Sequence, residues 1–236
     1  MGYEKYYGEK MSAERVQQVT MSKVYGWMTL ALMVSALTAV YTASSEAMLS
    51  LILGSKLRFV GLGIAEVALV VYVSARISRL SFSTAAALFG LYAVLNGVTM
   101  SVILLAYSAS TIYAAFFSTG LTFGVMSFVG YTTNRDLTAI GSFLLMALVG
   151  LIIATLVNLF FHFTWMESLI TYAGLFIFVG LTAYDTQNVK NALAYSEAAG
   201  IAVDTRKIAL MGALSLYLDF VNLFLYILRL LGGRRG

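Results

Sequence analysis

The sequence predicts an all-α integral membrane protein built as a bundle of seven transmembrane helices. Its 236 residues are 60% hydrophobic and only 11% charged, whereas a soluble domain is typically about half apolar and about a quarter charged. The mean hydropathy is +0.86. A spanning helix needs about 20 mostly apolar residues, and seven segments meet that length: 24–43, 58–77, 83–106, 111–131, 138–161, 168–189 and 208–231.

The polar ends of the chain complete the predicted domain organisation. Residues 1–23 are expected to form a mobile cytoplasmic tail, residues 24–231 one membrane domain, and residues 232–236 a short basic C-terminal tail. Short connections between the apolar segments leave no room for a second domain.

Lysine and arginine set the predicted orientation, because basic loops favour the cytoplasm. With the N-terminus inside, the inner side holds Lys5, Lys10, Arg15, Lys23, Arg76, Arg79, Arg135, Lys190, Arg206 and Lys207. The outer loops hold only Lys56 and Arg58. Arg229, Arg234 and Arg235 follow the seventh segment and argue against this orientation. Seven full spans are therefore favoured over a re-entrant seventh segment, and the side of the C-terminus stays open.

Several functional classes are excluded by composition. The chain has no cysteine, so it has no disulfide or thiolate metal site, and its single histidine, His162, excludes a multi-histidine zinc site. The net charge of +4 sits in short loops and reflects membrane topology rather than affinity for nucleic acid. Membrane lipid is the expected surrounding, and no cofactor is expected beyond calcium as a permeant or bound ion.

Three carboxylates, Glu66, Asp185 and Asp219, lie inside predicted spans. Such residues usually face the bundle interior and mark ion or proton pathways. The alternative for each is a structural carboxylate that hydrogen-bonds neighbouring helices and locks the bundle.

The two aspartates lie on polar helix faces. Ser215, Asp219, Asn222 and Tyr226 follow a spacing that places them on one side of a helix. In the preceding segment, Thr182, Asp185 and Asn188 likewise share a face. Both aspartates are predicted to lie in the cytoplasmic half of consecutive helices, so they are expected to approach each other.

Two adjacent carboxylates in a dry site cannot both ionise cheaply and would share a proton. Protonated, the pair of Asp185 and Asp219 is a hydrogen-bonded latch. Deprotonated, the two groups repel each other or together bind a divalent cation such as calcium, which prefers oxygen ligands. The sequence thus predicts a pH sensor and a candidate calcium site at one place.

Glu66 lies near the centre of the second segment, where it would extend a polar path across the membrane. Asn96 and Thr99 in the third segment are expected to form interhelical hydrogen bonds. Arg76 ends the second segment on the cytoplasmic side, from where it either reaches lipid phosphate or turns inward toward an aspartate as a latch.

Small residues offer candidate helix contacts. Gly61 and Ala65, and also Gly120 and Gly124, have the four-residue spacing that lets helix backbones approach closely. In a chain with 20 glycines, such spacings also arise by chance.

No enzyme motif is evident. The Gly-Asp motifs of an intramembrane aspartyl protease are absent, because Asp185 follows Tyr184 and Asp219 follows Leu218. A rhomboid-type serine protease motif, a phosphate-binding loop and a dinucleotide fingerprint are absent as well. The protein is therefore not expected to be an enzyme.

Four stretches carry a family resemblance: "SLYLDFVNLF" (215–224), "VGLTAYDTQNVKN" (179–191), "KVYGWMTLAL" (23–32) and "YTTNRDL" (131–137). They resemble the transmembrane Bax inhibitor motif family, in its bacterial branch. The resemblance implies six helices around a central hydrophobic seventh and a pH-sensitive calcium leak. It places the family's aspartate dyad on Asp185 and Asp219 and its pore-path acid on Glu66, and it makes Arg76 the candidate for a dyad-pairing arginine.

Three functional hypotheses follow. The first is a calcium-permeable leak channel of a bacterial inner membrane, with a cytoplasmic N-terminus and a proton-gated aspartate pair. The second is a regulatory membrane protein without physiological flux, bound to a membrane AAA protease, as some bacterial relatives are, or to another partner. The third is a cation/proton exchanger that uses the same carboxylates.

Overall fold

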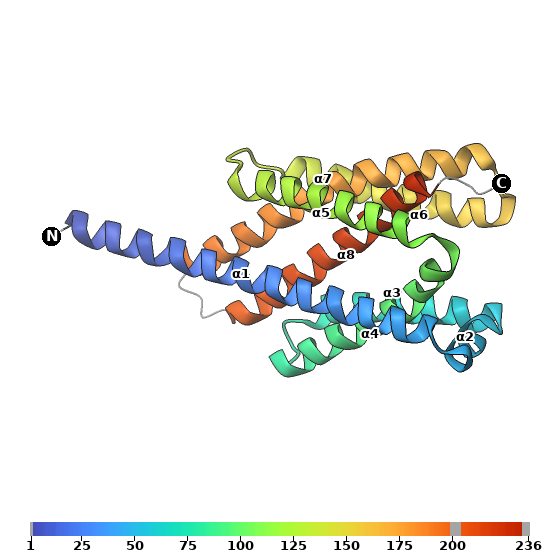
Figure 1. Ribbon diagram of the computed structural model, residues 1–236. Coiled ribbons are helices and arrows are strands. Elements are labelled where there is room, and N and C mark those ends of the chain that lie inside the picture. The colour runs from blue at the N-terminus through green and yellow to red at the C-terminus, as the bar shows by residue number, and fades with distance from the viewer. Residues whose placement is uncertain (1, 199–203, 233–236) are drawn as a thin grey trace. The chain divides into compact units, whose positions relative to one another are not determined.

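The computed structural model describes residues 2–198 and 204–232, and its side chains are described from residue 15 to 195 and from 204 to 232. Every regular element in these ranges is a helix, which confirms the predicted all-α class (Figure 1). The helices are α1 (Gly2–Ala43), α2 (Glu46–Leu53), α3 (Lys56–Arg76), α4 (Phe82–Ala106), α5 (Ala109–Thr132), α6 (Thr138–Phe161), α7 (Thr164–Ala198) and α8 (Thr205–Leu231).

Seven helices in the described ranges are long and apolar enough to cross a membrane, as predicted. They are α1 from Arg15, α3, α4, α5, α6, α7 up to Tyr195, and α8. The eight-residue helix α2 was not predicted, because it is too short to span. The polar residues before the first span continue it as one helix from Gly2.

Serine side chains start two of the helices. The Ser45 hydroxyl accepts a hydrogen bond from the Met48 N–H at the start of α2, and Ser81 accepts one from Thr84 N–H at 3.1 Å at the start of α4. Each bond satisfies a backbone donor that has no partner within its helix. These caps fix where α2 and α4 begin.

The chain divides into two compact units. The first unit contains the described parts of 1–108 and 192–217, and the second contains the described parts of 109–191 and 218–236. Both α7 and α8 therefore contribute residues to each unit. The predicted arrangement of six helices around a central seventh stays a prediction, although α8 has the largest buried share of the seven spans, at 61% of its most apolar stretch.

In the first unit, α1 runs along α4, which also contacts α3 (Figure 1). Gly97 of α4 lies against α1 so closely that a Cβ there would meet the Ser35 backbone and the Thr38 side chain. The absence of a side chain at Gly97 lets the two backbones pack together.

In the second unit, α7 contacts α5, α6 and α8. Gly130 of α5 packs against the Ala183 backbone of α7, and Gly174 of α7 packs against the Tyr226 ring of α8. The Phe220 ring of α8 contacts Phe116 and Phe123 of α5, with ring centroids 5.8 and 5.5 Å apart. Aromatic and glycine contacts thus hold the helices that carry both aspartates.

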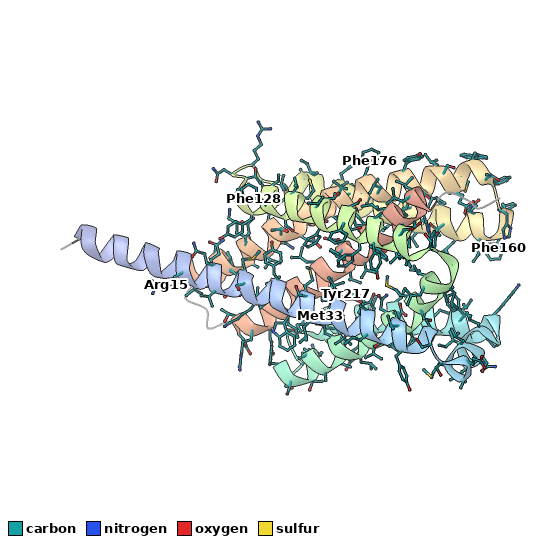
Figure 2. All side chains as sticks on the ribbon, in the orientation of Figure 1. Arg15, Met33, Phe128, Phe160, Phe176 and Tyr217 are labelled. Atoms are coloured by element: carbon teal, nitrogen blue, oxygen red, sulfur yellow. The ribbon has the colours of Figure 1, made fainter. Side chains whose placement is uncertain are left out.

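Large apolar side chains cover much of the exposed surface of the second unit. Phe128, Phe160 and Phe176 are 68%, 78% and 72% exposed and lie along its outer face (Figure 2). Trp165, also exposed, stacks near Phe163 with ring centroids 6.3 Å apart. Such a surface suits lipid rather than water, in agreement with the seven candidate spans.

Candidate functional site

Asp219 lies in the middle of α8 and is 3% exposed. The residues around it on α8 are mostly apolar, and Leu216, Tyr217 and Leu223 are fully buried. Among the residues that the structure describes, Asp219 Oδ2 has no hydrogen-bond partner. A buried polar atom without a partner is costly, so this carboxyl group is poorly explained as a simple structural lock.

Asp185 lies on α7 in the same unit and is partly buried. It is close enough to Asp219 for the charges of the two carboxyl groups to interact. Both aspartates lie in the same compact unit, on helices that contact each other at Gly174 and Tyr226, and their direct pairing stays a prediction. Two such groups in a buried place can share one proton, repel each other when both are ionised, or bind a cation between them.

The pair alone does not make a complete calcium cage. Within the described residues, no group of three or more acidic, histidine or cysteine side chains lies together. Calcium takes six to eight oxygen ligands, so an ion held by Asp185 and Asp219 would need further oxygens from carbonyls, hydroxyls or water.

Glu66 on α3 is half-buried and belongs to the first unit. Its Oε1 accepts a hydrogen bond from the Thr99 hydroxyl at 2.9 Å, and its Oε2 accepts one from Asn96 Nδ2 at 3.4 Å. Both donors lie on α4, which confirms the predicted interhelical hydrogen bonds of Asn96 and Thr99. A carboxylate inside a span thus has two polar partners from a neighbouring helix.

Comparison with known proteins decides the family. The family model described as inhibitor of apoptosis-promoting Bax1 matches residues 17–236. The chain belongs to the Bax inhibitor family. It is similar to the inner membrane protein YbhL of Escherichia coli, with 45% identity over 224 residues that cover 92% of this chain and 93% of the relative.

Other bacterial members of the Bax inhibitor family are also similar over most of their length. An uncharacterized protein of Borreliella burgdorferi is 42% identical over 92% of both chains, and uncharacterized protein RP147 of Rickettsia prowazekii is 41% identical over 91% of this chain and 89% of its own. The resemblance drawn from the four sequence stretches is therefore confirmed.

The polar residues predicted to support the dyad lie in different environments. Thr182 is fully buried and donates to the Phe178 carbonyl at 2.7 Å, and Asn222 donates to the Leu218 carbonyl at 2.8 Å. Both bonds stay within their own helices. Ser215 is partly buried and Asn188 is exposed. Their role beside the aspartates stays a prediction.

Arg76 occupies the last turn of α3, and its side chain is exposed. The predicted latch between Arg76 and the aspartates stays a prediction. Arg76 is also the last residue of its span, the position from which an arginine reaches lipid phosphate.

A second group of residues around Asp185 was missed by the sequence reasoning. The Gln187 side chain is buried, accepts from the Leu137 N–H at 2.9 Å and donates to the Arg135 carbonyl at 2.8 Å. Lys190 Nζ donates to the Tyr131 carbonyl at 2.8 Å. These bonds fasten α7, just beyond Asp185, to the last turn of α5 and to the loop between α5 and α6.

Thr186 adds a contact inside the span. Its hydroxyl lies 3.2 Å from the Ser127 hydroxyl of α5, and both side chains are buried. Polar residues directly after Asp185 in "YDTQNVK" were the available signal, but they also fit the polar end of a span. Only the position of α5 and its following loop shows what they bind.

Proposed function

We propose that this member of the Bax inhibitor family is a pH-sensitive, calcium-permeable leak of the bacterial inner membrane, gated by Asp185 and Asp219. The observation that carries the proposal is the buried carboxyl group of Asp219, which has an unpartnered oxygen among the described residues and a second carboxyl group nearby. The similar Escherichia coli protein, named as an inner membrane protein, supports the location.

The gate would work through the charge of the aspartate pair. At low pH the two groups share a proton and hold α7 and α8 together. At higher pH both ionise. For scale, any two unit charges about 4 Å apart repel by about 4 kcal/mol at an effective dielectric constant near 20. An energy of that size shifts a two-state equilibrium by roughly a thousandfold, which is enough to open a closed path.

The ion path would include Glu66, and the open pair would pass calcium through short-lived contacts with carboxylate oxygens. The N-terminus is proposed to lie in the cytoplasm, because Lys and Arg concentrate in the tail and in alternate loops. Arg76 is proposed to limit opening by pairing with the dyad when the aspartates are ionised.

Calcium flux into liposomes that contain the purified full-length protein tests the proposal between pH 5 and pH 8. Flux is expected to rise with pH in the parent, and Asp185→Asn and Asp219→Asn are expected to remove that dependence. Asp136→Asn is the matched control, because Asp136 is an exposed loop residue. It is expected to behave as the parent does.

Absence of flux above that of empty liposomes, with all four proteins folded, would contradict the leak and favour a regulatory protein that binds a membrane protease or another partner. Flux that drives protons in the opposite direction would instead favour an exchanger.

A further inference from the structure

A chain of side-chain hydrogen bonds, buried from Ser35 to Asn96 and half-buried at its end, runs through the first unit to Glu66. The Ser35 hydroxyl of α1 lies 2.7 Å from the Tyr217 hydroxyl of α8, which donates to Asn96 Oδ1 of α4 at 2.9 Å. Asn96 Nδ2 then donates to Glu66 of α3. Tyr217 is 0% exposed, and its ring packs edge-on against Phe89 and Tyr92. Hydrogen bonds and edge-on ring contacts thus hold the Tyr217 phenol on several sides.

The direction of these hydrogen bonds determines which atom of the Asn96 amide, the donor nitrogen or the acceptor oxygen, faces Glu66. Because the Tyr217 hydroxyl donates to Asn96 Oδ1, the amide nitrogen of Asn96 faces Glu66. Thr99 presents a hydroxyl to the other carboxyl oxygen. Two donors directed at one carboxyl group favour its ionised form, which only accepts hydrogen bonds.

The same residues can hold the opposite direction. Either hydroxyl of Ser35 and Tyr217 can be the donor in their contact, and Ser35 also reaches the Ala93 carbonyl at 2.7 Å. If Tyr217 donates to Ser35 and Ser35 donates to Ala93, the Tyr217 oxygen becomes an acceptor. A rotated Asn96 amide then donates to Tyr217 and turns its Oδ1 toward Glu66. That direction suits a protonated Glu66, which donates to Oδ1.

We propose that Tyr217 is a positioning residue whose hydroxyl sets the orientation of the Asn96 amide, so that the direction of the Ser35–Tyr217–Asn96 chain follows the protonation of Glu66. The inference deepens the proposed function, on which it rests for the place of Glu66 in the ion path. In this inference Glu66 gains or loses one proton, and no proton is transferred along the Ser35–Tyr217–Asn96 hydrogen bonds.

Other titratable groups near Glu66 are few. Among the described residues, Tyr92 of α4 and Tyr217 of α8 are titratable side chains whose charges would interact with that of the Glu66 carboxyl group. Tyr92 lies outside the chain of bonds, so Tyr92→Phe removes a nearby phenol without changing the donors that reach Asn96. It is the matched control for Tyr217→Phe.

The test is infrared difference spectroscopy of the purified full-length protein in lipid, titrated between pH 4 and pH 9. The carboxylic acid C=O band of Glu66 is identified by its loss in Glu66→Gln. Tyr217→Phe removes the donor to Asn96, so the band is expected to persist about one pH unit higher than in the parent, a tenfold change in the protonation equilibrium. Tyr92→Phe is expected to titrate within about 0.3 unit of the parent.

Ser35→Ala supplies a variant with the opposite expected sign. Without Ser35, the Tyr217 hydroxyl has Asn96 Oδ1 as its remaining acceptor in the chain, so the donor direction toward Glu66 is locked and the band is expected to vanish at lower pH. A merely structural role for Tyr217 would not move the two variants in opposite directions.

The inference is overturned if Tyr217→Phe titrates like the parent, if both variants shift the band the same way, or if no Glu66 band forms anywhere in the range. None of these readings uses calcium. A failed flux experiment would therefore remove the proposed leak while leaving the infrared result to decide the role of Tyr217.

Discussion

Replacing Gly130 with alanine tests the contact between α5 and α7 that places Asp185. A Cβ at Gly130 would meet the Ala183 carbonyl oxygen and would lie 2.9 Å from both its carbonyl carbon and its Cα. All three atoms belong to backbone, so no side chain can rotate away. Because the carbonyl oxygen is the nearest of the three atoms, the helices would have to separate by about 1 Å or more to reach ordinary van der Waals contact.

Gly120→Ala is the matched control, because Gly120 lies in the same helix and a Cβ there would meet no described atom within 4 Å. Both changes gain up to about 1 kcal/mol of helix propensity. The difference between the unfolding free energies of the two variants therefore isolates the packing penalty at Gly130, which is about 1–3 kcal/mol for overpacking. We expect Gly130→Ala to be less stable than Gly120→Ala by that amount.

The measurement is reversible unfolding in mixed detergent and SDS micelles, followed by circular dichroism. The free energy of unfolding is compared between the two variants and the parent. A difference below about 0.5 kcal/mol between Gly130→Ala and Gly120→Ala would refute the close α5–α7 contact. That result would also contradict the inference that α5 holds in place the part of α7 that carries Asp185.

Two further predictions concern the loop between α5 and α6. Gln187→Leu leaves the Leu137 N–H and the Arg135 carbonyl without their side-chain partner, so we expect a loss of about 1–3 kcal/mol. Amide hydrogen exchange at Leu137 should then be at least about tenfold faster, whereas Asn188→Leu at the neighbouring exposed position should leave it unchanged. Hydrogen bonds from the Thr138 hydroxyl and N–H hold the pKa of Asp136 below its ordinary value. The ionised form therefore stabilises the fold above the unfolded pKa near 4, and this contribution is lost as the pH falls through the folded pKa. The difference in melting temperature between the parent and Asp136→Ala should be positive at pH 6 and should shrink progressively as the pH is lowered below about 4, and an unchanged difference would contradict it.

Hydropathy predicted the seven spans well, because the length of an apolar run is a direct requirement of the bilayer. The predicted ends of the spans agreed less well with the observed helix ends where a helix continues beyond its apolar part. The sixth predicted span was expected over 168–189, whereas the corresponding helix α7 runs from Thr164 to Ala198. Polar residues end a hydrophobic run but do not end a helix, since hydrogen bonding along the backbone continues regardless of side-chain polarity.

Periodicity placed Asp185 and Asp219 on polar faces, but it could not show what the other residues on those faces bind. Thr182 and Asn222 donate to carbonyls four residues earlier in their own helices, an acceptor always within reach. The small-residue spacing was also a poor guide. Gly61, Gly120 and Gly124 have open surroundings among the described residues, whereas Gly97 and Gly130 make the close contacts. Helix contacts depend on which helices are neighbours, and one sequence does not specify that.

Tyr217 shows the same limit most clearly. In an apolar run it reads as one more aromatic packing residue, and its role follows only from Ser35 and Asn96, which lie 182 and 121 positions away in the chain. It stands two residues before Asp219 in an uninterrupted helix. Two residues turn a helix by about 200°, so the two side chains point to nearly opposite sides of α8.

If both proposals hold, one helix carries two proton-linked groups of residues, one through Tyr217 and one through Asp219. A continuous helix could then couple the two. A double-mutant cycle with Tyr217→Phe and Asp219→Asn measures this link as the departure of the combined effect on unfolding from the sum of the single effects. A linked helix should give a coupling energy of about 0.5–3 kcal/mol. Additivity within about 0.3 kcal/mol would mean that the two groups act independently, although they share one helix.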